Sequence, residues 1–87
     1  MRTVKRKDVI RPQDQILILG LGVSGRSAAN FCAERGARVT AADERPLRDL
    51  AGLDELHEEV DIVAGRPLPD PRSFDYAIVS PGIGAKR

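Results

Sequence analysis

Residues 16–25 read Ile-Leu-Ile-Leu-Gly-Leu-Gly-Val-Ser-Gly, and this stretch decides the fold. Its apolar half predicts a buried strand, and the residues after its glycines predict a helix. A helix that begins directly after a parallel strand offers an anion its free backbone N–H groups and the positive end of its dipole. Gly20 permits the tight turn, Gly22 lets a phosphate approach the backbone, and Gly25 lets helix and strand pack closely. The stretch therefore predicts a loop that binds a phosphorylated, nucleotide-like ligand.

Strand-like and helix-like segments alternate along the rest of the chain. We expect four strands, over residues 15–19, 38–42, 60–64 and 74–79. A helix is expected over residues 24–35, capped at its carboxyl end by Gly36. Leucines at every third position of residues 47–56 predict a short helical or irregular element, which Gly52 interrupts. The prolines of residues 65–73 predict a loop, and the apolar last strand predicts burial on both faces.

This alternation predicts an α/β fold with parallel strands and right-handed crossovers. We expect a half-Rossmann domain over residues 15–87, whose four-stranded, mostly parallel sheet has the order 3-2-1-4 and is flanked by helices. Ligands of such sheets bind outside the carboxyl ends of the strands. Three loops should converge there, over residues 20–25, 43–45 and 80–83.

Composition sets the class of protein. The chain has 87 residues with a net charge of +1, few aromatic residues and one cysteine. These values argue against a nucleic-acid-binding surface and an internal disulfide, and they suit a single small domain in the reducing cytoplasm. No apolar run is long enough to span a membrane. Residues 1–14 form a basic leader that we expect to be flexible, although such an arm can also contact a partner.

Asp43 ends the second predicted strand, eighteen residues after Gly25. In dinucleotide-binding domains an acid at this place accepts hydrogen bonds from the adenosine ribose. The alternative is an aspartate that only forms the turn that follows. Glu44 and Arg45 come next and can contribute at the same place or form a solvated charge pair.

A second pattern overlaps the glycine loop. Residues 20–27 differ by one residue from a P-loop, which requires a lysine at the position of Arg26. Arginine does not replace that lysine, and no acid for magnesium ends a later strand, so we exclude nucleotide hydrolysis. His57 and Cys32 have no partners for a metal site, and Ser80 has no histidine placed to activate it. No catalytic or metal-binding residue is therefore expected in this chain.

Three segments together resemble a known family. Residues 16–25, Val-Thr-Ala-Ala-Asp-Glu-Arg at 39–45 and Ala-Ile-Val-Ser-Pro-Gly-Ile at 77–83 are similar to the N-terminal domain of the Mur ligases, most of all those that add D-glutamate. The resemblance runs from about residue 15 to residue 83. Its distinctive part is Ser-Pro-Gly-Ile after the fourth strand, which ordinary dinucleotide-binding domains do not need.

The resemblance implies that the domain binds the UDP part of UDP-N-acetylmuramoyl-L-alanine. By position, the diphosphate would lie on the glycine loop, the uracil beside residues 43–45 and the sugar phosphate beside residues 80–83. The residues implied are Gly20, Gly22, Val23, Ser24, Gly25, Asp43, Glu44, Arg45, Ser80, Pro81, Gly82 and Ile83. Glu44 departs from the small hydroxyl residue expected at its position in the family.

The resemblance also implies what the chain lacks. In this family a central domain binds ATP and Mg²⁺, the substrate carboxylate is phosphorylated, and the amine of D-glutamate attacks the acyl phosphate. An 87-residue chain is expected to be an excised domain or truncated ligase, inactive by itself, monomeric and cytoplasmic. The alternative that the residues leave open is an NAD(P)- or FAD-binding domain of an oxidoreductase or regulator. A third possibility is an interaction module that binds no ligand.

Overall fold

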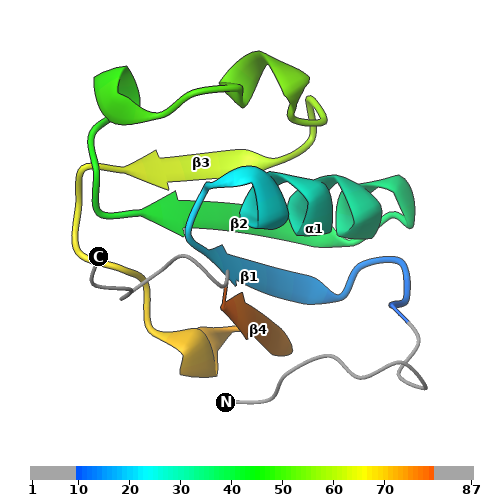
Figure 1. Ribbon diagram of the computed structural model, residues 1–87. Helices are drawn as coiled ribbons and strands as arrows, with labels where there is room; N and C mark the ends of the chain where they lie inside the picture. Colours follow the sequence, from blue (N-terminus) through cyan, green and yellow to red (C-terminus); the bar gives the residue numbers. More distant parts are fainter. Residues whose placement is uncertain (1–9, 80–87) are drawn as a thin grey trace.

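The computed structural model describes residues 10–79 (Figure 1). Its regular elements are β1 (Gln15–Leu19), α1 (Val23–Glu34), β2 (Arg38–Asp43), β3 (Asp61–Ala64) and β4 (Tyr76–Val79). Three short 3₁₀ turns, η1 (Leu47–Asp49), η2 (Leu53–Glu55) and η3 (Pro71–Ser73), lie in the connections. Every predicted strand is therefore present, with ends that move by up to two residues.

The four strands form one parallel sheet in the order β3-β2-β1-β4. This confirms the predicted half-Rossmann α/β fold. Leu19 at the end of β1 lies between Ala42 of β2 and Val79 of β4. Because neighbouring strands are parallel and nearly in register, their carboxyl ends meet at one edge of the sheet, on the left in Figure 1.

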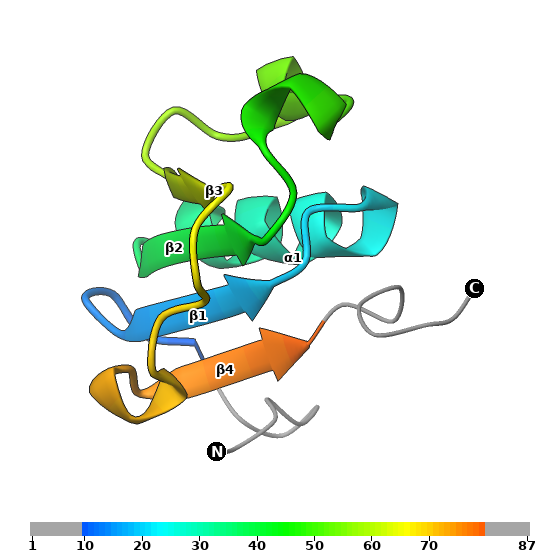
Figure 2. The ribbon, with the colours of Figure 1, turned by 90° about the vertical axis from the view of Figure 1, so that its left-hand side faces the viewer.

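The two faces of the sheet are covered differently, as the two views show (Figures 1 and 2). On one face α1 packs over β1 and β2, and its buried residues join the larger core: Ile16, Ile18, Ala29, Cys32, Ala33, Val39 and Ala41. On the other face, the segment that leads from β3 to β4 crosses the sheet. Its Leu68 and Phe74 pack against Leu17 and Ala77. In residues 10–79 the second face is thus covered by an extended segment with one 3₁₀ turn, in place of a second helix.

β4 differs from the prediction of burial on both faces. Ala77 is buried, but Tyr76 and Ile78 are only partly buried and Val79 is 44% exposed. The physical reason is topological, since β4 pairs only with β1 among the described strands and lies at the edge of the sheet. The predicted order 3-2-1-4 already placed this strand at the edge, so the order was right and the expectation of burial on both faces was wrong.

The remaining local predictions agree with the structure. Gly36 follows α1 with φ +85°, and its N–H donates to Ala33 O at 2.9 Å, as a carboxyl-terminal cap requires. Gly52 has φ +74° and separates η1 from η2, which confirms an interrupted element. Ile10 is buried in the core, so the folded part includes residues ahead of β1, whereas residues 1–9 lie outside the described range. No helix in residues 10–79 has the length and hydropathy needed to cross a bilayer.

Candidate functional site at the carboxyl edge of the sheet

The glycine loop is fixed to the sheet by its first and last glycines. Gly20 has φ +100°, a conformation that favours glycine, and its N–H donates to Ala42 O at 2.8 Å. A Cβ added to Gly25 would fall on the carbonyl oxygen of Gly20. The two glycines therefore let the first turn of α1 lie directly against the end of β1.

Gly22 lies on the open side of the same loop. It caps α1 with an extended backbone, φ −76° and ψ −168°, and a Cβ there would meet nothing within 4 Å. Its carbonyl accepts the N–H of Arg26 at 2.9 Å, so the N–H groups of Val23, Ser24 and Gly25 have no acceptor inside the helix. No acidic side chain occupies the first turn. This surface can accept an anion without first displacing a carboxylate.

Asp43 joins the end of β2 to the glycine loop. The side chain is almost fully buried, and its Oδ2 accepts the N–H of Leu21 at 2.9 Å. Oδ1 accepts both the backbone N–H of Arg45 at 2.9 Å and its Nε at 3.0 Å, while Oδ2 also accepts Arg45 Nη2 at 2.8 Å. The hydrogen bonds from the Arg45 guanidinium, helped by those from the two backbone N–H groups, lower the pKa of Asp43 to about 2. Asp43 is therefore an anion that ties two loops together.

These four hydrogen bonds bear on the predicted role of Asp43. An ionised carboxylate has about four lone-pair positions, and protein donors occupy all of them here. The Arg45 side chain remains 54% exposed although it is paired, and Glu44 is also exposed. Residues 44 and 45 thus face the solvent at the carboxyl edge, while the buried Asp43 carboxylate binds the glycine loop through the Leu21 N–H.

Two of the three loops predicted to converge do so. The bonds from Gly20 to Ala42 and from Leu21 to Asp43 connect residues 20–25 with residues 43–45 directly. β4 ends at Val79, beside Leu19, which is the last residue of β1. The third predicted segment, Ser80, Pro81, Gly82 and Ile83, lies outside the described residues.

The Arg26 side chain binds backbone carbonyls of the protein, unlike a P-loop lysine, which binds phosphate. Its Nη1 donates to Ala51 O at 2.8 Å and, at the longer distance of 3.4 Å, to Leu21 O. The guanidinium therefore lies between the glycine loop and the connection that follows β2. The sequence pattern indicated only that Arg26 stands where a P-loop has lysine. Its position next to Gly25 nevertheless placed it in the first turn of the predicted helix.

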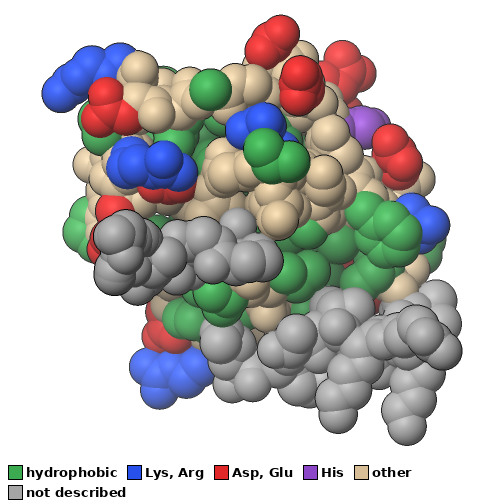
Figure 3. Space-filling view, viewed as in Figure 1, with side chains coloured by type: hydrophobic (Ala, Val, Ile, Leu, Met, Phe, Trp, Pro, Cys, Tyr) green, Lys and Arg blue, Asp and Glu red, His purple; other side chains and the backbone are tan. Residues whose placement is uncertain are grey.

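Other candidate chemistry is weak in the described range. Cys32 is buried in the core, where burial raises the pKa of its thiol, as expected for a packing residue. Within residues 10–79, no three His, Cys, Asp or Glu side chains lie close enough together to hold a metal ion. The acidic side chains around the histidine gather at the upper right of Figure 3, away from the carboxyl edge on the left. They therefore do not surround the surface formed by the glycine loop.

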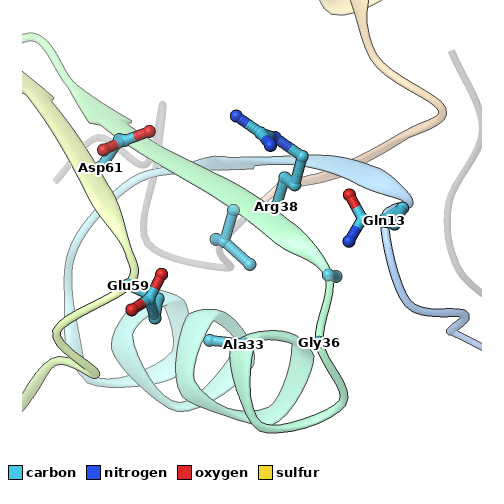
Figure 4. Close-up of a pocket in the computed structure, with 8 residues that line it drawn as sticks. Gln13, Ala33, Gly36, Arg38, Glu59 and Asp61 are labelled. Carbon is cyan, nitrogen blue, oxygen red and sulfur yellow. The ribbon is translucent and has the colours of Figure 1, made fainter.

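A separate groove opens at the opposite, amino-terminal edge of the sheet (Figure 4). It has a volume of about 470 Å³ and is lined by residues from four parts of the chain: Gln13, Ala33, Gly36, Ala37, Arg38, Val39, Glu59 and Asp61. Arginine and carboxylate side chains share its wall. No sequence motif pointed to this groove, and it does not adjoin the glycine loop.

Comparison with known proteins shows the family of the chain. A model of the N-terminal domain of MurD-like Mur ligases matches residues 14–87. The chain belongs to the MurD-like Mur ligases. The UDP-N-acetylmuramoylalanine–D-glutamate ligase of Geobacter metallireducens is 39% identical over 80 residues, which cover 78% of this chain and 16% of the relative. The enzyme of the same name from Bifidobacterium longum subsp. infantis is 45% identical over 60 residues, 67% of this chain and 12% of the relative.

The MurD-like match covers only part of a larger architecture. The chain spans about 12–16% of the length of the curated relatives that it matches. No solved structure gave a significant match. Membership of the MurD-like family places the domain among ligases of peptidoglycan synthesis, so the glycine loop need not be interpreted as that of a dehydrogenase.

Proposed function

We propose that this MurD-like domain binds the UDP part of UDP-N-acetylmuramoyl-L-alanine at the carboxyl edge of its sheet. The observation that carries the proposal is the open first turn of α1. There, the N–H groups of Val23, Ser24 and Gly25 have no helical acceptor, and the space at Gly22 is empty. A diphosphate supplies the negative charge and the acceptor oxygens that such a helix end favours.

The rest of the ligand would extend from the diphosphate over neighbouring loops. Glu44 and Arg45 are exposed beside the glycine loop and would flank the uracil. Asp43 would act chiefly by holding the Leu21 N–H and the Arg45 guanidinium, because its own acceptor positions are filled. Ser80, Pro81, Gly82 and Ile83 would border the sugar-phosphate side, as the family resemblance implies.

The complete reaction belongs to the parent ligase in this proposal. The parent would add D-glutamate to UDP-N-acetylmuramoyl-L-alanine in the cytoplasm, with ATP and Mg²⁺ bound by a domain outside this chain. The present residues do not fit the binding of ATP, because Arg26 stands where a P-loop requires lysine and its guanidinium donates to Ala51 O. We therefore propose that the 87-residue chain binds substrate as a monomer and is inactive alone.

The contacts of Asp43 argue against the dinucleotide alternative. A ribose hydroxyl would have to replace at least one of the donors that now fill its carboxylate, two of which come from the charged Arg45 guanidinium. Charge-assisted hydrogen bonds of this kind are about twice as strong as neutral ones. The structure of the site thus favours a ligand that contacts the backbone of the glycine loop over one that depends on Asp43.

The test is a titration of the 87-residue chain with UDP, UDP-N-acetylmuramoyl-L-alanine, NAD and NADP, followed by backbone amide NMR. We expect the uridine ligands to shift the amides of residues 21–25 and 44–45, with affinities down to the millimolar range, about −4 kcal/mol. Shifts with NAD in the absence of shifts with UDP would contradict the proposal, and so would the absence of any response.

A glycine variant sharpens this titration. Gly22→Val should keep the fold, because the backbone at Gly22 is extended and open, and should abolish the UDP-dependent shifts by filling the phosphate position. The control is Ser73→Val, which introduces the same residue at an exposed position of η3, ahead of β4. Undiminished UDP binding by Gly22→Val would show that the loop has only a structural role.

A further inference from the structure

Leu21 is held through both of its backbone polar groups by side chains of opposite charge. Its N–H donates to the buried Asp43 carboxylate at 2.9 Å, and its carbonyl accepts the Arg26 guanidinium at 3.4 Å. Asp43 comes from the end of β2, and Arg26 comes from the first turn of α1. Two neighbouring elements thus fix two successive peptide groups of the glycine loop.

The contact of Arg26 determines where the next N–H points. The Leu21 carbonyl belongs to the same planar peptide group as the N–H of Gly22. In a trans peptide these two groups point in opposite directions. A cation that binds the Leu21 carbonyl therefore turns the Gly22 N–H away from itself. Gly22 lies at the open surface where we place the phosphate.

Arg26 is itself held in place and cannot easily leave the loop. Its side chain is only 15% exposed, and Nη1 donates to Ala51 O at 2.8 Å. The guanidinium packs against the Cα of Gly52, where an added Cβ would come within 2.5 Å of Cζ. Glu55 Oε1 lies 3.9 Å from Nε. The connection between β2 and β3 thus holds this guanidinium in place.

We propose that Arg26 is a positioning residue for the phosphate-binding loop, and that it orients and polarises the Leu21–Gly22 peptide so that the Gly22 N–H binds the diphosphate. A charged donor on the carbonyl strengthens the N–H of the same peptide as a donor, because hydrogen bonds in series polarise one another. This inference rests on the proposed UDP site. It assigns Arg26 an indirect role, in which the side chain does not touch the ligand.

The experiment compares Arg26→Met with Arg35→Met in the 87-residue chain. Both variants remove one arginine from α1 or its carboxyl-terminal cap. The Arg35 side chain, however, is exposed; within residues 10–79 it donates to Phe31 O, one turn earlier, and packs over the Phe31 ring. We expect Arg26→Met to weaken UDP binding about tenfold, the size of one charge-assisted hydrogen bond, and to leave uridine binding within about twofold. Arg35→Met should change neither affinity.

A second readout does not require ligand. The amide proton of Gly22 should move upfield in ligand-free Arg26→Met, because its peptide loses the polarising cation, and should stay in place in Arg35→Met. If Arg26→Met does not fold, Arg26→Lys supplies the same readouts. Lysine keeps the positive charge but lacks the planar guanidinium. Arg26→Lys should therefore shift the Gly22 amide proton less, in the same direction.

The outcomes separate this inference from the proposed function. Failure of the wild-type chain to bind UDP would overturn the proposed function, whereas the Gly22 shift would still test Arg26. A Gly22 amide that is unmoved in both Arg26 variants would overturn the inference. Equal losses of UDP and uridine affinity would do the same, since they would show that Arg26 only stabilises the fold.

Discussion

At the scale of single residues, the chain contains the same short motif in two environments. Asp43 with Arg45 and Asp70 with Arg72 both pair an aspartate with the backbone N–H and the guanidinium of the arginine two residues later. Asp43 is buried and also accepts the Leu21 N–H. The Asp70 side chain is exposed and accepts hydrogen bonds from Arg72 within the same turn. The motif therefore links two loops at one place and forms a local turn at the other.

This difference predicts a pH dependence of stability. The pKa of Asp43 is lowered from 3.8 to about 2 in the folded protein, so its contribution is complete above pH 4 and is lost as the pH falls toward 2. We expect Asp43→Asn to lower the free energy of unfolding at pH 7 by about 1–2 kcal/mol, allowing for screening of the exposed guanidinium. Urea unfolding at pH 7 and at pH 2.5 should show that the difference between wild type and variant shrinks at the lower pH.

Asp70→Asn is the matched control for this prediction. Its pKa is lowered by the same kind of hydrogen bond from Arg72, but the pair is fully exposed and should contribute nothing measurable. Equal effects of the two substitutions on urea unfolding would mean that the link from Asp43 to Leu21 has no energetic role.

At the scale of elements, α1 holds the connection between β2 and β3 through the polar side chains of Arg26 and Asn30 as well as through leucines. Asn30 Nδ2 donates to Glu55 O at 2.9 Å, and Asn30 Oδ1 accepts the N–H of His57 at 2.7 Å. Leu53 and Leu56 pack against the core beside this bridge. A segment with only two 3₁₀ turns thus gains fixed partners on the helix.

Removal of this bridge should loosen the connection locally. Asn30→Ala removes both hydrogen bonds, one exposed and one partly buried, and we expect a loss of about 1–2 kcal/mol. Hydrogen exchange measured by NMR should show faster exchange of the His57 amide, while amides of β1 keep their protection. Ser27→Ala, at an exposed position of the same helix, should leave both unchanged. An unchanged His57 exchange rate in Asn30→Ala would contradict the role assigned to the bridge.

Sequence patterns indicated this element only in outline. The leucine spacing predicted a short helical or irregular segment, and Gly52 was expected to interrupt it, as it does. Asn30 carried no sequence signal, because its partners are backbone groups about 25 residues away. Side-chain-to-backbone contacts between distant segments depend on the fold and are not encoded in a local pattern.

At the scale of the whole molecule, β1 is the centre of the domain. It pairs with β2 on one side and β4 on the other, and its side chains enter the cores on both faces: Ile16, Leu17, Ile18 and Leu19. In a domain of 87 residues, the few fully buried side chains carry much of the burial.

Truncation at this centre should therefore be costly. Leu17 is fully buried, and we expect Leu17→Ala to lower the free energy of unfolding by about 2–5 kcal/mol, through lost burial and the cavity left behind. Leu47→Ala removes the same atoms at a side chain that is 57% exposed and should cost less than about 1 kcal/mol. Thermal unfolding followed by circular dichroism measures both, and similar midpoints for the two variants would contradict this view of the core.

The sequence by itself determined the order of elements, the parallel sheet and the position of the glycine loop between strand and helix. Those features follow from local causes: apolar runs, glycine conformations and the start of a helix next to a strand. The tertiary structure alone decided that all acceptor positions of Asp43 are filled, that Arg26 lies behind the Leu21 carbonyl and that β4 is partly exposed. These features depend on contacts between residues distant in sequence, which exist only once the sheet has brought the carboxyl ends of its strands together.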